Sequence, residues 1–123
     1  MSSVSSITPI LRNFKISEFD CKHTGENRMN PWFLSLLDAL RNECSFPFVI
    51  TSGYRSPKHP IEAAKDSPGT HAQGIAADIR VRNGTERMLI VKHALKLGFS
   101  GIGVAKDFVH VDTRETSEVM WVY

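Results

Sequence analysis

One stretch of the chain has apolar residues at helical spacing and carries its own start signal. The apolar residues recur at positions i, i+3, i+4 and i+7: Phe33, Leu36, Leu37 and Leu40. Asn30 is a favourable N-cap, and Pro31 suits the first helical position. The pattern predicts a helix that begins at Pro31 and buries this apolar stripe.

A second helix is predicted after Asn83. Asn83 can cap it, with Glu86 three residues later as in a variant capping box. The expected apolar stripe consists of Met88, Val91 and Leu95. Gly98 is expected to end this helix, because glycine readily adopts the left-handed conformation found there. A short helical turn is also predicted within residues 60–65.

Two stretches alternate in the way that half-buried strands do. In residues 74–81, Ala77 and Ile79 share one face, and Asp78 lies on the other. In residues 108–113, His110 and Asp112 share a face, while Val109 and Val111 point the opposite way. Shorter strand-like runs occupy residues 46–51, 99–105 and 119–123. Helices that precede and interrupt such strands indicate an α+β fold with a central, mainly antiparallel sheet.

Length and composition agree with one small domain over residues 1–123. The chain has 123 residues, of which 41% are hydrophobic, enough to form one compact core. Phe14, Ile16 and Phe19 are expected to anchor the N-terminal region on this core, which leaves residues 1–13 as a flexible arm.

Charge and hydropathy exclude two classes of partner. The formal net charge is only +2, far from the basic footprint of a nucleic-acid binder. No apolar stretch is long enough for membrane insertion or for a signal peptide. We therefore expect a protein that is cytoplasmic as synthesised. We also expect it to be a monomer.

Three residues with metal-binding side chains stand out. His71 is on a predicted loop, seven residues before Asp78 on a strand, and His110 is on another strand. Each alone has an ordinary reading, as a surface histidine, a charge at a strand edge or a satisfied half-buried histidine. Together they form a set of two imidazoles and one carboxylate, which leaves the fourth position of a catalytic zinc ion open for water.

Further residues suit roles around such a metal. Asp107 lies three residues before His110, where a carboxylate could act as general base for the zinc-bound water that attacks a carbonyl. Arg55, on a loop after a strand, could bind a substrate carboxylate or the developing oxyanion. Gln73 and Ser52 could add hydrogen bonds to the substrate.

Three motifs give the chain a resemblance to a known family. They are Ser52-Gly53-Tyr54-Arg55-Ser56-Pro57, the segment 70–78 with His71 and Asp78, and Gly101-Ile102-Gly103 followed by Phe108-Val109-His110-Val111-Asp112. They resemble the M15 family of zinc D-alanyl-D-alanine carboxypeptidases, particularly its short single-domain members from bacteriophages. Two positions depart from the family pattern, because Pro60 replaces an asparagine and Thr70 a serine.

The resemblance carries expectations about fold and role. It implies an α+β fold shared with Hedgehog signalling domains, with His71, Asp78 and His110 as zinc ligands. It further implies that Asp107 is the general base, that Arg55 binds the substrate or oxyanion, and that the substrate is a peptidoglycan stem peptide. Phage members commonly act as endolysins, and a chain without an export signal would then need a holin or another route to the cell wall.

Two alternatives stay open from the sequence. One is a zinc-containing module that binds cell-wall peptides without cutting them, because a shared fold does not guarantee catalysis. The other concerns the bond: Arg55 suits a carboxypeptidase through a free carboxylate and an endopeptidase through an oxyanion.

Overall fold

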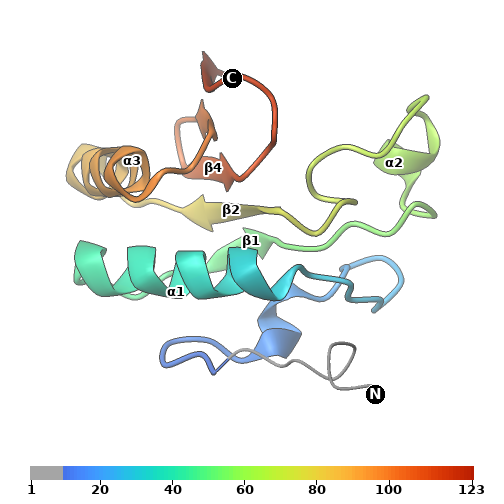
Figure 1. Ribbon diagram of the computed structural model, residues 1–123, viewed down its shortest axis with the longest axis horizontal. Coiled ribbons are helices and arrows are strands. Elements are labelled where there is room, and N and C mark those ends of the chain that lie inside the picture. The colour runs from blue at the N-terminus through green and yellow to red at the C-terminus, as the bar shows by residue number, and fades with distance from the viewer. Residues whose placement is uncertain (1–9) are drawn as a thin grey trace.

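The computed structural model describes residues 10–123, which form three α-helices, a short 3-10 helix and five strands (Figure 1). The 3-10 helix spans Ile16–Phe19, and the α-helices are α1 (Pro31–Cys44), α2 (Pro60–Ala63) and α3 (Gly84–Leu97). The strands are β1 (Ile50–Ser52), β2 (Ala76–Arg80), β3 (Gly101–Val104), β4 (Phe108–Asp112) and β5 (Val119–Val122). The strand of residues 46–51 expected from the sequence is therefore shorter and begins at Ile50.

The strands form one sheet in the order β1-β2-β4-β3-β5. Neighbouring strands run antiparallel except for β3 and β5, which are parallel. The sheet is thus mixed but mainly antiparallel, and it confirms the predicted α+β class. In Figure 1, α1 and α3 lie beside the sheet, and α2 stands at the opposite end of the molecule from α3.

The apolar core lies between the sheet and the pair of long helices. β2 contributes Ala77 and Ile79 to it, and β4 contributes Val109 and Val111, all fully buried. The helices face them with Phe33, Leu34, Leu37, Leu40, Ile90 and Ala94. Because side chains alternate along a strand, Asp78, His110 and Asp112 project from the other face of the sheet.

Both predicted helix starts are confirmed. The Asn30 side chain accepts hydrogen bonds from the backbone N–H groups of Trp32 and Phe33, and Asn83 accepts one from Glu86. At the end of α3, Gly98 has φ +94°, the left-handed conformation expected of a glycine cap.

The expected apolar stripe of α3 is wrong at two of its three positions. Met88 is 65% exposed and Leu95 is 53% exposed, and Val91 packs only partly against the core. The buried face consists of Glu86, Ile90 and Ala94 instead. These residues recur every four positions, and their row is the one that meets the sheet and α1.

The N-terminal anchors are confirmed in part. Phe14 and Phe19 are buried, whereas Ile16 is 37% exposed on the 3-10 helix. Of the arm predicted over residues 1–13, residues 1–9 lie outside the described residues. The backbone N–H groups of Arg12 and Asn13 donate to the Asp38 carboxylate on α1.

Within residues 10–123, no helix has the length and apolar character needed to span a membrane.

Candidate metal centre

The structure brings together the three ligands predicted from the sequence. One potential ligand atom from each of His71, Asp78 and His110 lies within 4.8 Å of the other two. Asp78 Oδ1 is 3.3 Å from Nε2 of His71 and 2.9 Å from Nδ1 of His110. The atoms that converge are therefore one carboxylate oxygen and one nitrogen from each imidazole ring.

Strand pairing and a loop place these side chains. Asp78 on β2 is the direct partner of His110 on β4, and directly paired residues of an antiparallel sheet project from the same face. His71 reaches them from the loop before β2, where its Nδ1 lies 2.8 Å from the carbonyl oxygen of Gly53. That contact directs Nε2 of His71 toward Asp78.

The donor set fits zinc. Zinc takes two histidine nitrogens and a carboxylate oxygen at about 2.0–2.2 Å, so tetrahedral ligand atoms lie about 3.3 Å apart. The two separations at Asp78, 3.3 Å and 2.9 Å, are close to this value. Three protein ligands leave one tetrahedral position free, as a catalytic zinc site requires.

The charges of the group agree with a cation site. Burial alone would raise the pKa of Asp78, but hydrogen bonds with His110 and His71 outweigh it and hold the pKa at about 2. Burial alone would lower the pKa of His110, but its contacts with Asp112 and Asp78 raise it. Asp78 is therefore an anion at neutral pH, and a metal ion would compete with a proton for His110.

Arg55 lies on the same side of the sheet as the ligands. Ser52 pairs with Asp78 in the sheet, and the Arg55 guanidinium lies 3.5 Å from the Ser52 hydroxyl oxygen. The backbone N–H of Arg55 also donates to the carbonyl of His71. These contacts place a permanent positive charge next to Ser52, the sheet partner of Asp78.

The comparisons with known proteins agree with this geometry. The family model described as Peptidase M15 matches residues 12–112, most of the chain. The chain belongs to the M15 peptidase family. A search of curated proteins gave no match. The family's members are zinc peptidases, so the protein is a metallopeptidase with a peptide substrate, and His71, Asp78 and His110 form its candidate zinc site.

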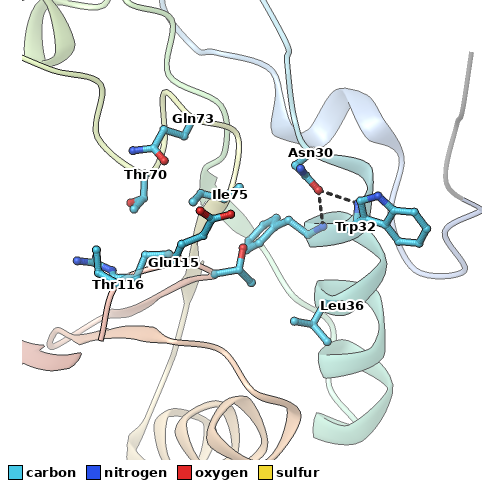
Figure 2. A pocket seen from close by; sticks show the side chains of 11 residues that line it. Asn30, Trp32, Leu36, Thr70, Gln73, Ile75, Glu115 and Thr116 are labelled. Carbon is cyan, nitrogen blue, oxygen red and sulfur yellow. Dashed lines mark hydrogen bonds between the residues drawn. The ribbon is translucent and has the colours of Figure 1, made fainter. Parts of the chain in front are cut away.

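A pocket of about 650 Å³ lies in this M15 peptidase between the start of α1 and the loops that flank β2 and β4, and none of the three ligands lines it. Figure 2 shows it between the start of α1, with Trp32 and Leu36, and two loops that carry Thr70, Gln73 and Glu115. Two residues connect it to the zinc site: Thr70 directly precedes His71, and Arg114 lines the pocket while donating to Asp112. Gln73 is thus on the wall of a cavity, whereas Ser52 lies beside Arg55.

Asp107 is placed apart from the three ligands. It is exposed in the turn between β3 and β4, and its backbone carbonyl accepts a hydrogen bond from Val81. At about 3.3 Å per residue, its Cα lies about 10 Å along the strand from that of His110. Its role as general base stays a prediction.

Two carboxylates beside this site were not assigned a role from the sequence. Glu62 on α2 is buried and accepts hydrogen bonds from Arg55 and Lys65, and it therefore fixes the guanidinium of Arg55. Asp112 lies directly behind His110, with its Oδ2 2.7 Å from Nε2 of the ring. The shared strand face of His110 and Asp112 was a signal for the second, but no spacing rule links Glu62 to Arg55.

Proposed function

We propose that this M15 peptidase hydrolyses an amide bond in the stem peptides of peptidoglycan, as a phage-type endolysin or a cell-wall carboxypeptidase. The convergence of His71 Nε2, His110 Nδ1 and Asp78 Oδ1 beside Arg55 carries the proposal. The substrate class is supported by the three motifs that resemble the D-alanyl-D-alanine carboxypeptidases and their phage relatives.

Each residue has a part in this proposal. Zinc, when bound, polarises the carbonyl of the scissile bond and lowers the pKa of water at the open position. Arg55 binds a substrate carboxylate or the negative charge that develops on the carbonyl oxygen, and its contact with Glu62 holds it in place. Gln73 donates or accepts hydrogen bonds from the wall of the pocket, and Ser52 does so beside Arg55.

The central experiment is a digest of purified muropeptides followed by mass spectrometry. We expect one new pair of peptide termini, loss of cleavage when zinc is removed with a chelator, and recovery when zinc is added back. Cleavage that continues in the zinc-free protein would remove the metal from the mechanism.

The bond that is cut can be assigned with a matched pair of substrates. A carboxypeptidase that uses Arg55 to bind the terminal carboxylate should lose activity on a peptide whose C-terminus is amidated. An endopeptidase that uses Arg55 for the oxyanion should cut both peptides at similar rates. An Arg55→Lys variant, which keeps the charge but loses the planar fork, should be impaired in either case.

A second candidate function is a module that binds wall peptides without cutting them. The observation that favours it is the exposed position of Asp107, about 10 Å along the strand from His110. If Asp107 is the base, Asp107→Asn should keep its zinc and its peptide affinity while losing cleavage. A parent protein that binds muropeptides with zinc present but turns none over would establish the binding module.

A further inference from the structure

A carboxylate that accepts four hydrogen bonds from two residues stands directly behind one of the zinc ligands. Asp112 is fully buried, and its Oδ2 lies 2.7 Å from Nε2 of His110. Arg114 donates to the same carboxylate from three nitrogen atoms, with its backbone N–H at 3.1 Å, Nε at 3.0 Å and Nη2 at 2.6 Å. Both oxygens of Asp112 are therefore held by donors of Arg114.

The surrounding backbone is shaped to admit this carboxylate. Gly101 on β3 pairs with Asp112 on β4. A Cβ atom at Gly101 would lie 2.2–2.4 Å from the carboxylate atoms of Asp112, so any side chain there would displace them. The Arg114 guanidinium is in turn covered by Trp121, with its Cζ 5.0 Å from the ring centre. Gly101 on one side and Arg114 on the other therefore restrict the position of the Asp112 carboxylate.

This arrangement decides which nitrogen of His110 carries the proton. A neutral imidazole has one N–H donor and one acceptor nitrogen, whereas a carboxylate only accepts. Asp112 faces Nε2 and Asp78 faces Nδ1, so without a metal ion both nitrogens face an acceptor. When a metal ion takes the place of the proton at Nδ1, Nε2 is the nitrogen that keeps its N–H, because Asp112 accepts from it. At His71 the roles of the two nitrogens are exchanged. The carbonyl oxygen of Gly53 accepts from Nδ1, which leaves Nε2 for the metal.

We propose that Asp112 is a positioning residue of the zinc site, which holds His110 as the Nε2–H tautomer so that Nδ1 can bind zinc, and that Arg114 fixes Asp112 for this purpose. The proposal rests on the zinc site and not on the identity of the substrate. Carboxylates that orient ligand histidines in this way contribute about 10–100-fold to metal affinity.

The test is Asp112→Asn, with zinc affinity measured by competition against a chromophoric chelator. An asparagine cannot replace this carboxylate, because Arg114 donates to both oxygens and the amide NH₂ would face a donor of Arg114 in either orientation. In one of the two orientations the NH₂ would also face Nε2 of His110. We expect the dissociation constant for zinc to rise about 10–100-fold. In the zinc-loaded protein, the proton NMR signal of the His110 Nε2–H group should also lose the downfield shift that a carboxylate acceptor produces.

A matched control separates positioning from a general loss of structure. Asp38 is another buried aspartate, but it accepts from the backbone N–H groups of Arg12 and Asn13 and touches none of the zinc ligands. Asp38→Asn should lower the free energy of unfolding and leave both the zinc affinity and the Nε2–H signal unchanged. Wild-type affinity and an unchanged signal in Asp112→Asn would overturn the proposal.

Two further variants keep the test decisive if Asp112→Asn does not fold. Arg114→Gln leaves the carboxylate in place but removes its clamp, and Gly101→Ala keeps every polar group but pushes the carboxylate aside. Both should weaken zinc binding, by less than Asp112→Asn, and wild-type affinity in both would equally overturn the proposal. Because zinc binding is measured without a substrate, a wild-type protein that binds zinc but cleaves no wall peptide contradicts the proposed function and not this inference.

Discussion

The two faces of strand β4 are buried to the same extent but are held by different forces. Val109 and Val111 are fully buried against apolar side chains of the helices. On the opposite face, His110 is 3% exposed and Asp112 is fully buried, and both are surrounded by hydrogen-bonding partners. One strand thus carries the core on one side and the metal centre on the other.

The difference teaches where stability and chemistry reside in this fold. Removing an apolar side chain leaves a cavity, whose cost falls on the free energy of unfolding. Removing a polar one leaves its partners unpaired and changes the charge and direction of the groups that hold the metal. Substitutions on the two faces should therefore separate zinc affinity from stability.

The largest effect is expected on the polar face, from His110→Ala. This change removes one of three zinc ligands, so zinc affinity and peptide hydrolysis should fall by roughly 100-fold or more. The loss should exceed the loss of about 10–100-fold expected when only a residue that orients a ligand is removed. Metal content of the dialysed protein and cleavage of a muropeptide measure the two losses. His93→Ala on α3, on the helical side of the sheet, is the control and should retain zinc.

The apolar face is tested on β2, where Ile79 directly follows the ligand Asp78. Ile79 is fully buried in the core, so Ile79→Ala should lower the free energy of unfolding by about 2–5 kcal/mol, and Ile79→Val by about 0.5–1.5 kcal/mol. Urea unfolding measures both. The zinc affinity of the folded protein should be unchanged, and a large loss of affinity would show that the two faces are coupled through the strand.

The two faces of β4 could be predicted from the sequence because side chains along a strand alternate between its faces. Alternation alone separates His110 and Asp112 from Val109 and Val111, and the structure confirms it. The buried face of a helix is harder to predict when apolar residues occur on several of its faces. α3 contains Leu89, Ile90 and Val91 in succession, and the elements packed against the helix decide which of its faces is buried. That is why Met88 and Leu95 were misplaced.

The contacts around the site could be predicted only in part. The three ligands follow from residue type, spacing and the family motifs, and the structure groups them. The partners that orient them are set by tertiary contacts: the carbonyl of Gly53 behind His71 is 18 residues away in the sequence. A backbone carbonyl has no residue type to recognise, so only the folded chain shows it.

A smaller effect is expected from filling space on the metal side of the sheet. A Cβ at Gly103 would lie 2.6 Å from Nε1 of Trp121, whose ring centre is 5.1 Å from that of His110. Gly103→Ala should cost about 1–3 kcal/mol of unfolding free energy and move the indole. Fluorescence of Trp121, measured in a Trp32→Phe background, should change its emission maximum.

Gly84 provides the matched control for that substitution. It lies in the first turn of α3, and a Cβ there would meet its nearest neighbour, Nη1 of Arg87, at 3.6 Å. Gly84→Ala should therefore be neutral or stabilising, since alanine favours helix by up to about 1 kcal/mol over glycine. Equal destabilisation at Gly84 and Gly103 would contradict the close packing around Trp121.

The smallest effect is expected at Glu62, which lies outside the sheet and holds Arg55. Burial alone would raise the pKa of Glu62, but hydrogen bonds from Lys65 and the backbone of Gly69 lower it. A carboxyl whose pKa is lower in the folded state stabilises the fold above its unfolded pKa, about 4.3, and loses this contribution as the pH falls through the folded pKa. Glu62→Gln should remove that contribution.

The difference in unfolding free energy between wild type and Glu62→Gln should thus be largest above pH 5 and shrink as the solution becomes more acidic. Urea unfolding of the two zinc-free proteins across this range measures it. Because Glu62 also restrains Arg55, the variant should cleave peptide more slowly at unchanged zinc affinity. If Glu62→Gln lost zinc instead, α2 would contribute to metal binding, and stability and zinc affinity would not be separable in the way proposed for the two faces of β4.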